Sequence, residues 1–139
     1  MRHSTAIWDI YPRPQLKRNN YVNLNGSWDF CLSKYGDLPE QYDEVITVPF
    51  CPESALSGIG RTIEPGSYLF YRHALSIPEA FSEGRVLLHI GAADQIADIY
   101  VNSQRVGHHE GGYTAFTVDI TDAMAEENTL VIRFRLCLP

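Results

Sequence analysis

The chain has 139 residues, of which 45% are hydrophobic and 20% are charged, and its formal net charge is −6 at pH 7. This composition is that of an ordinary globular protein and fits one domain. The eleven Lys and Arg residues are scattered and form no basic stripe, so nucleic acid is not an expected partner. No apolar run approaches the roughly 20 residues that a membrane-spanning helix needs, and the first residues lack a signal-peptide core. We therefore predict a cytoplasmic protein without a membrane partner.

Residues 1–22 are predicted to form an extended arm that wraps the outside of the domain. Pro12 and Pro14 cannot donate backbone hydrogen bonds, which prevents a regular ladder here. Trp8 and Tyr11 are the expected anchors of this arm. Residues 23–139 are then predicted to form a single sandwich domain.

Apolar residues that alternate with polar ones predict most of the strands. These strands are expected over residues 24–32, 45–48, 68–77, 86–90, 96–102 and 129–136. In the first of them, Trp28, Phe30 and Leu32 share one face, so Trp28 is expected to point inward. Apolar residues at helical spacing are almost absent, and a helical turn is expected only within 120–126. Strands of this spacing, separated by Gly and Pro turns, predict an all-β fold, an antiparallel β-sandwich.

A long loop over residues 49–66 is punctuated by proline and glycine. Loops of more than about a dozen residues in compact domains are usually functional or disordered. Its apolar residues Phe50, Leu56 and Ile59 predict that the loop packs on the domain. Arg61 has two open interpretations, a hydrogen bond to sugar hydroxyls or an ion pair with an acid.

The segment 96–121 is the most informative part of the chain. A β-rich run reaches a polar turn at Asn102-Ser103-Gln104, and a second run leads to Gly111-Gly112. An aromatic loop then enters a third run. Its Tyr113 and Phe116 are the better candidates for stacking on a sugar ring, because an aromatic plane offers contact area at little entropic cost.

Several segments of the chain together resemble the amino-terminal sandwich of glycoside hydrolase family 2, which includes the β-galactosidases and β-glucuronidases. The resemblance is carried by residues 23–30, 48–54, 56–60, 70–72, 98–102, 106–113 and 116–121. It implies a jelly-roll sandwich like that of galactose-binding domains. Family members usually continue beyond the strand that matches 129–136, so the last strand is expected to be missing. Two edges without partners would favour strand exchange or a homo-oligomer.

Retaining glycoside hydrolysis needs two carboxyl groups about 5–5.5 Å apart. The resemblance places both in a (β/α)₈ barrel, which needs roughly 200 residues or more and is therefore expected to be absent here. The acids near the matching segments are instead expected to cap backbone amides or to pair with arginine. These are Glu53, Asp94, Asp98, Glu110 and Asp119. No catalytic residue is predicted, and the chain alone should be inactive although its parent resembles a retaining glycosidase.

Metal and cofactor sites are not expected. His108 and His109 are adjacent, and adjacent residues of a strand point to opposite faces, so the two imidazoles cannot easily share one ion. By the resemblance, 109–113 belongs to the framework, and a polar network that fixes the loop is the favoured interpretation. The three cysteines have no Cys-x-x-Cys spacing, which argues against a disulfide framework and a zinc site.

Three functions follow as hypotheses. The first is a sugar-binding and scaffolding domain of a family 2 glycosidase, whose partners would be carbohydrate and the catalytic barrel of the parent chain. The second is a free-standing carbohydrate-binding module, and the third is a purely structural assembly domain. The residues expected to face the sugar or the barrel are Arg61, His109, Glu110, Tyr113 and Phe116.

Overall fold

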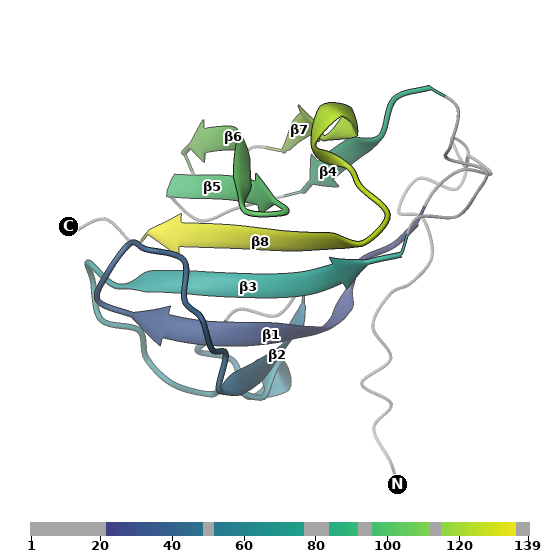
Figure 1. The fold of residues 1–139 in the computed structure, drawn as a ribbon. Coiled ribbons are helices and arrows are strands. Elements are labelled where there is room, and N and C mark those ends of the chain that lie inside the picture. Colours follow the sequence, from purple (N-terminus) through teal and green to yellow (C-terminus); the bar gives the residue numbers. More distant parts are fainter. Residues whose placement is uncertain (1–21, 49–51, 77–83, 92–95, 112–114, 136–139) are drawn as a thin grey trace, which may run out of the picture.

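The computed structural model describes residues 22–48, 52–76, 84–91, 96–111 and 115–135 (Figure 1). Within these ranges the regular elements are strands and two short 3₁₀ helices. The strands are β1 (Gly26–Ser33), β2 (Glu44–Val48), β3 (Tyr68–Leu75), β4 (Leu87–Ile90), β5 (Ile96–Val101), β6 (Gln104–Glu110), β7 (Phe116–Asp119) and β8 (Asn128–Arg135). The 3₁₀ helices are η2 (Ala55–Ser57) and η4 (Thr121–Ala123). The predicted arm 1–22 lies almost entirely outside the described residues. No helix in the described part is long and apolar enough to cross a membrane.

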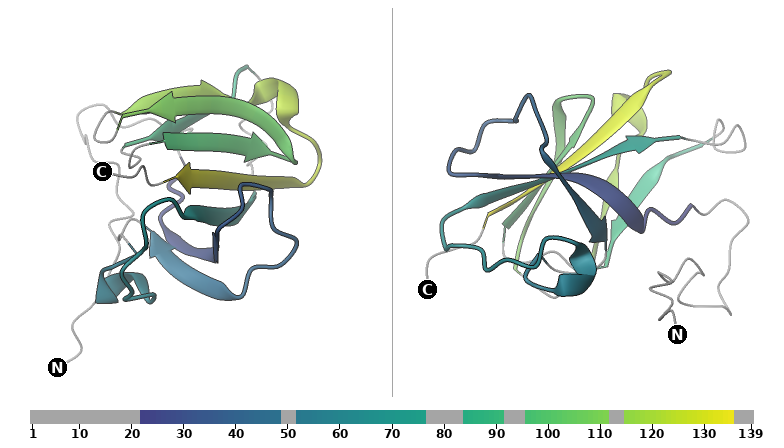
Figure 2. Two further views of the ribbon diagram at one scale, coloured as in Figure 1. Left: turned by 90° about the vertical axis from the view of Figure 1, so that its left-hand side faces the viewer. Right: turned by 90° about the horizontal axis from the view of Figure 1, so that it is seen from below.

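The strands form two antiparallel sheets. Six of them make one sheet in the order β2-β1-β3-β8-β5-β6, and β4 pairs with β7 in a second, smaller sheet. The larger sheet is strongly twisted, and its strands fan out when the molecule is seen from below (Figure 2). The predicted all-β fold of antiparallel sheets is confirmed.

The core lies on the inner face of the larger sheet. Its fully buried side chains include Phe30, Ile46, Ile99 and Leu130, and each such side chain contributes about 1.5–3 kcal/mol relative to exposure. Leu88 and Val118 of the smaller sheet and Ile63 of the long loop belong to the same cluster. The core is thus shared by two sheets and one loop. Trp28 points into it as predicted and is 5% exposed.

The long loop closes the core beside β2. Ser54 caps η2 by accepting a hydrogen bond from the backbone N–H of Leu56, and Gly58 ends the helix in a left-handed conformation. Ile59 packs against the core, as expected, and Phe50 lies outside the described residues. The expectation for Leu56 is wrong, because this side chain is 53% exposed and lies on the outer side of the helical turn.

The opposite, outer face of the larger sheet is partly covered by the segment 34–43, which crosses in front of the sheet in Figure 1. This cover explains why Phe70, on the outer row of β3, is fully buried. The carbonyl oxygen of Gly36 accepts a hydrogen bond of 2.6 Å from Arg133 of β8, and the guanidinium of Arg72 lies 4.1 Å from the ring centroid of Tyr42. The side chains on the β8-β5-β6 half of this face form the candidate site.

Candidate functional site

The register of three neighbouring strands gathers charged side chains on the outer face. Asp98 of β5 is the Cα partner of Arg133 on β8 and of His108 on β6. Its chain neighbours Ala97 and Ile99 point inward and are fully buried, so alternation directs Asp98 outward. Cross-strand partners lie close enough to interact directly, which makes Asp98 the centre of the cluster.

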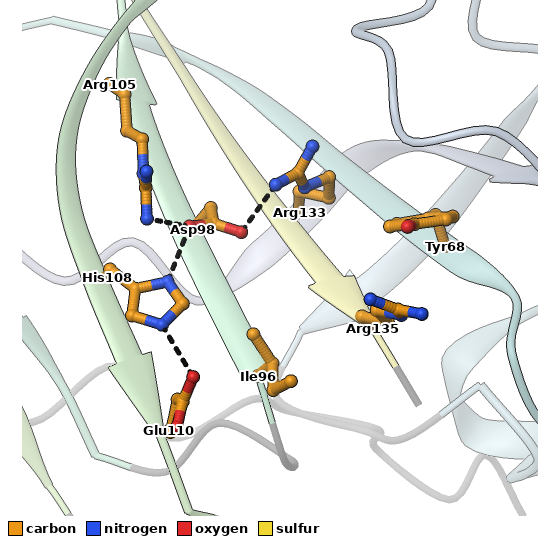
Figure 3. Close-up of a pocket in the computed structure, with 8 residues that line it drawn as sticks. All are labelled: Tyr68, Ile96, Asp98, Arg105, His108, Glu110, Arg133 and Arg135. Atoms are coloured by element: carbon orange, nitrogen blue, oxygen red, sulfur yellow. Dashed lines mark hydrogen bonds and ion pairs between the residues drawn. The ribbon is translucent and has the colours of Figure 1, made fainter. Parts of the chain in front are cut away.

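Asp98 accepts hydrogen bonds and ion pairs from three sides (Figure 3). One oxygen, Oδ2, lies 2.7 Å from Nη2 of Arg133. The other, Oδ1, lies 2.7 Å from Nδ1 of His108 and 2.8 Å from Nη2 of Arg105. The Asp98 side chain is only 6% exposed. A buried carboxylate requires such a set of donors, because an unpaired buried charge is strongly destabilising.

The environment of Asp98 favours its ionised form. Burial is the largest single effect and opposes ionisation, but hydrogen bonds from Arg133 and His108, with the charges of Arg133 and Arg105, outweigh it and lower the pKa of Asp98. The stabilisation from this carboxylate is therefore present above its unfolded pKa of about 3.9 and is lost as the pH falls through the lower folded value.

His108 bridges two carboxylates. Its Nδ1 faces Asp98, and its Nε2 lies 3.1 Å from Oε1 of Glu110. Carboxylates only accept hydrogen bonds, so the protonated imidazolium is the form that satisfies both contacts. Consistently, hydrogen bonds to Asp98 first and Glu110 second raise the pKa of His108. The His108 ring therefore lies between the two carboxylates. In a retaining glycosidase the substrate lies between the two catalytic carboxylates, and here the ring takes that place.

A shallow pocket of about 240 Å³ opens over this cluster. Besides the residues already named, Tyr68 of β3, Ile96 of β5 and Arg135 of β8 line it. The guanidinium carbons of Arg133 and Arg135 each lie 5.5 Å from the ring centroid of Tyr68. The pocket therefore combines a cationic wall with one aromatic ring and one aliphatic side chain.

The structure separates the residues predicted from sequence to face a ligand. Arg61 lies in the long loop beside β2, where its Nη2 is 2.5 Å from Oε2 of Glu44. His109 and Glu110 lie on β6, at the other end of the six-strand order. The structure therefore shows the ion pair of Arg61, and a contact of Arg61 to sugar hydroxyls stays a prediction.

His109 and Glu110 point to opposite faces of β6. Glu110 belongs to the outer pocket, whereas the His109 ring stacks on Phe116 of β7 with centroids 4.2 Å apart and planes at 10°. Phe116 is half-buried and packs against the core. Tyr113 lies outside the described residues. A sugar contact by any of these residues stays a prediction.

Asp98 and Asp119 have structural contacts of the predicted kind, whereas Asp94 lies outside the described residues. Asp98 pairs with arginines, as predicted. Asp119 accepts hydrogen bonds from the backbone N–H and the hydroxyl of Thr121, and pairs with Arg85 at 3.2 Å. The Thr121 hydrogen bonds are the main reason that the pKa of Asp119 is lowered. Across the described ranges, no group of three or more His, Cys, Asp or Glu side chains could hold a metal ion.

Sequence reasoning did not assemble the cluster itself. Arg133 and Arg135 could be assigned to the polar row of their strand, and Asp98 could be expected to pair with an arginine. Which arginine it meets depends on β5 and β8 being neighbours, and no local pattern indicates that. A weak signal existed in the outer rows of the two strands, where β5 carries the acid Asp98 and β8 carries Arg133 and Arg135.

A strongly twisted antiparallel sheet, packed on a smaller sheet over one apolar core, defines an antiparallel β-sandwich domain. The family described as "Glycosyl hydrolase 2 galactose-binding domain-like" matches residues 60–138. The chain belongs to this family, and the resemblance seen in its sequence motifs is confirmed.

Curated relatives and solved structures agree with this assignment. A β-glucuronidase of Streptococcus agalactiae is 28% identical over 92% of this chain, and one of Bacteroides fragilis is 35% identical over 81%. Among solved structures, a β-glucuronidase of Ruminococcus gnavus in complex with D-glucuronic acid has the same fold, with a TM-score of 0.70 and 18% identity. It matches 92% of this chain and 23% of its own chain.

The match covers a small part of each relative. The chain spans 21% of the Streptococcus agalactiae enzyme and 16% of the Bacteroides fragilis enzyme. The similarity is therefore to one domain of a larger glycosidase.

Proposed function

We propose that this chain is the non-catalytic amino-terminal sandwich of a family 2 glycosidase and that the whole protein hydrolyses β-glucuronides. The observation that carries the proposal is the match itself, which covers most of this chain and about a fifth of enzymes named β-glucuronidase. Other relatives in the set are named β-galactosidase and probable β-mannosidase. The glucuronide is favoured because that name recurs among the relatives that match over most of this chain.

The contacts of the described acids favour a non-catalytic role for this domain. Asp98 and Glu110 are the two acids of the pocket, and His108 bridges them with both ring nitrogens. Among the described residues, neither acid has the second, free carboxyl partner that retaining hydrolysis requires. The catalytic pair is thus assigned to the catalytic barrel of the parent chain, which this sandwich would support. Contacts to sugar through Arg61, Tyr113 or Phe116 belong to the same proposal.

Activity measurements on two proteins test this function. The first protein is the 139-residue chain, and the second is the product of the complete reading frame that contains it. Both are assayed with the 4-nitrophenyl β-glucuronide, β-galactoside and β-mannoside. We expect no turnover by the chain and turnover of the glucuronide by the complete product.

Two results would overturn parts of the proposal separately. Hydrolysis by the purified chain, abolished by Asp98→Asn, would show that the domain is itself catalytic. A complete product that prefers the galactoside or the mannoside would replace the substrate while leaving the domain's role intact.

A further inference from the structure

The outer pocket carries an excess of positive charge in an acidic chain. Three arginines line it against two carboxylates, and the bridging position of His108 adds a further cation. The chain as a whole has a formal charge of −6. A cluster of positive charge on an otherwise acidic protein attracts anions to the pocket.

Both carboxylates of the pocket are already paired, whereas Arg135 has no carboxylate partner among the described residues. Asp98 is shared by Arg133, Arg105 and His108, and Glu110 faces His108. Within the described part of the chain, Arg135 contacts the ring of Tyr68 and pairs with no carboxylate. Its guanidinium therefore keeps its hydrogen-bond donors for a group that enters the pocket.

The surroundings of Arg135 fix where such a group would bind. Its Cα partner across the sheet is Ile96 of β5, so an aliphatic side chain lies beside the cation. Tyr68 of β3 is the Cα partner of Arg135 on the other side of β8. The contact with the Tyr68 ring restricts the positions that the Arg135 guanidinium can take. Figure 3 shows Arg135 and Tyr68 on one side of the pocket and His108 and Glu110 on the other, with Ile96 between Arg135 and Glu110. A ligand here meets charge on one side and apolar surface on the other.

We propose that this pocket binds one oxyanion group, a carboxylate or a phosphate, carried by a small polar molecule of about the size of one sugar ring. Arg135 is the principal ligand-binding residue, because among the described residues it is the pocket arginine that pairs with no carboxylate. A planar guanidinium with paired donors suits both oxyanions. The volume of about 240 Å³ is of the size of a single ring. The site uses side chains of this chain alone and does not depend on the proposed hydrolase function.

A matched set of sugars tests the site by calorimetric titration of the chain. Glucuronate, glucose 6-phosphate and glucose share one ring and differ at carbon 6, and inorganic phosphate supplies the anion without the ring. We expect saturable binding of both anionic sugars and at least tenfold weaker binding of glucose. Inorganic phosphate that binds as tightly as glucose 6-phosphate would support the oxyanion site and identify the free ion as its ligand. Equal binding of glucose, or no saturable binding of either anionic sugar, would overturn the proposal.

Variants locate the binding. Arg135→Gln should weaken the anionic sugars at least tenfold, whereas Arg135→Lys should retain part of the affinity because it keeps the charge. Arg85→Gln is the matched control, since Arg85 is 79% exposed and pairs with Asp119 beside the smaller sheet. Backbone amide shifts on titration should concentrate at residues 96–98 and 133–135. Unchanged affinity in Arg135→Gln, with circular dichroism showing a folded protein, would refute the assignment.

Discussion

Asn102 joins three parts of the domain through one side chain. It lies in the turn between β5 and β6 with a φ of 51°, and Ser103 follows with a φ of 68°. Asparagine tolerates this left-handed conformation better than most residues. Its Nδ2 donates to the carbonyl of Ala123 and to Oδ1 of Asn128, and its Oδ1 accepts from the N–H of Thr129. One turn residue therefore fixes the start of β8.

Replacing Asn102 with alanine should destabilise the domain by roughly 2–3 kcal/mol, because the change removes these hydrogen bonds and places alanine in a left-handed conformation. Urea unfolding followed by tryptophan fluorescence measures the difference. Ser103→Gly is the matched control in the same turn, and it should be neutral or stabilising because glycine adopts positive φ without strain. An Asn102→Ala protein as stable as the parent would show that the side chain is dispensable.

Strand β6 is held by different physical interactions on its two faces. On the inner face, Gly107 lets β6 approach β7, because a Cβ atom there would lie 2.8 Å from Cγ2 of Val118. On the outer face, His108 links β6 to Asp98 of β5. The register between β5 and β6 also shifts between Ile99 and Tyr100, which indicates a β-bulge beside these contacts. Packing and charge together position this edge strand.

Gly107→Ala should destabilise the domain by about 1–3 kcal/mol through overpacking against Val118. Because the clash involves one side chain, the double variant with Val118→Ala should lose less stability than the two single variants together. Thermal and urea unfolding of the four proteins gives the interaction free energy. Strict additivity would mean that the two residues do not meet.

Removing His108 should change how stability depends on pH. The groups facing its ring are Asp98, Glu110 and Arg105, and the two carboxylates raise its pKa. A raised folded pKa gives stability that is fully present below the unfolded value of about 6.5 and is lost as the pH rises through the folded value. The stability difference between the parent and His108→Gln should therefore shrink with increasing pH.

Urea unfolding at several pH values between about 5.5 and 9 measures this difference. We expect a change below about 1 kcal/mol, because the His108 side chain is 38% exposed and solvent screens its charge. Glu110→Gln should flatten the pH dependence only in part, since Asp98 remains. A difference that grows with pH would contradict the bridging role.

The whole domain presents several strand edges. In the described part of the chain, β2 and β6 end the larger sheet, and β4 and β7 pair only with each other. Unpaired edges offer backbone donors and acceptors to a second chain. Val45 on β2 adds an apolar side chain that is 55% exposed. These edges would be covered either by further domains of a parent enzyme or by another copy of the chain.

We therefore predict that the isolated chain self-associates at high concentration. Sedimentation velocity should show a weight-average mass that rises with concentration, and Val45→Lys should reduce the rise by placing charge on an edge strand. Thr129→Lys adds the same charge to β8, which is paired on both sides, and should have little effect. A monomer at all concentrations would indicate that the edges are protected.

Much of the fold was predictable because its signals are local. The alternation in 24–32 placed Trp28 inward, and Asn102-Ser103 marked the turn, since side-chain period and turn conformation depend on neighbouring residues. The motifs of 98–121 also predicted the family correctly. Leu56 was assigned wrongly because an apolar residue alone does not reveal which side of a loop packs.

The charged pocket needed contacts between distant segments. Arg133 meets Asp98 across 35 residues and Gly36 across 97, and both contacts exist because β8 lies between β3 and β5 in the sheet. Strand order is set by the joint burial of the apolar rows, a property of the whole core. Composition and alternation thus determined an antiparallel sandwich, whereas the assembled core decided which charges share one site.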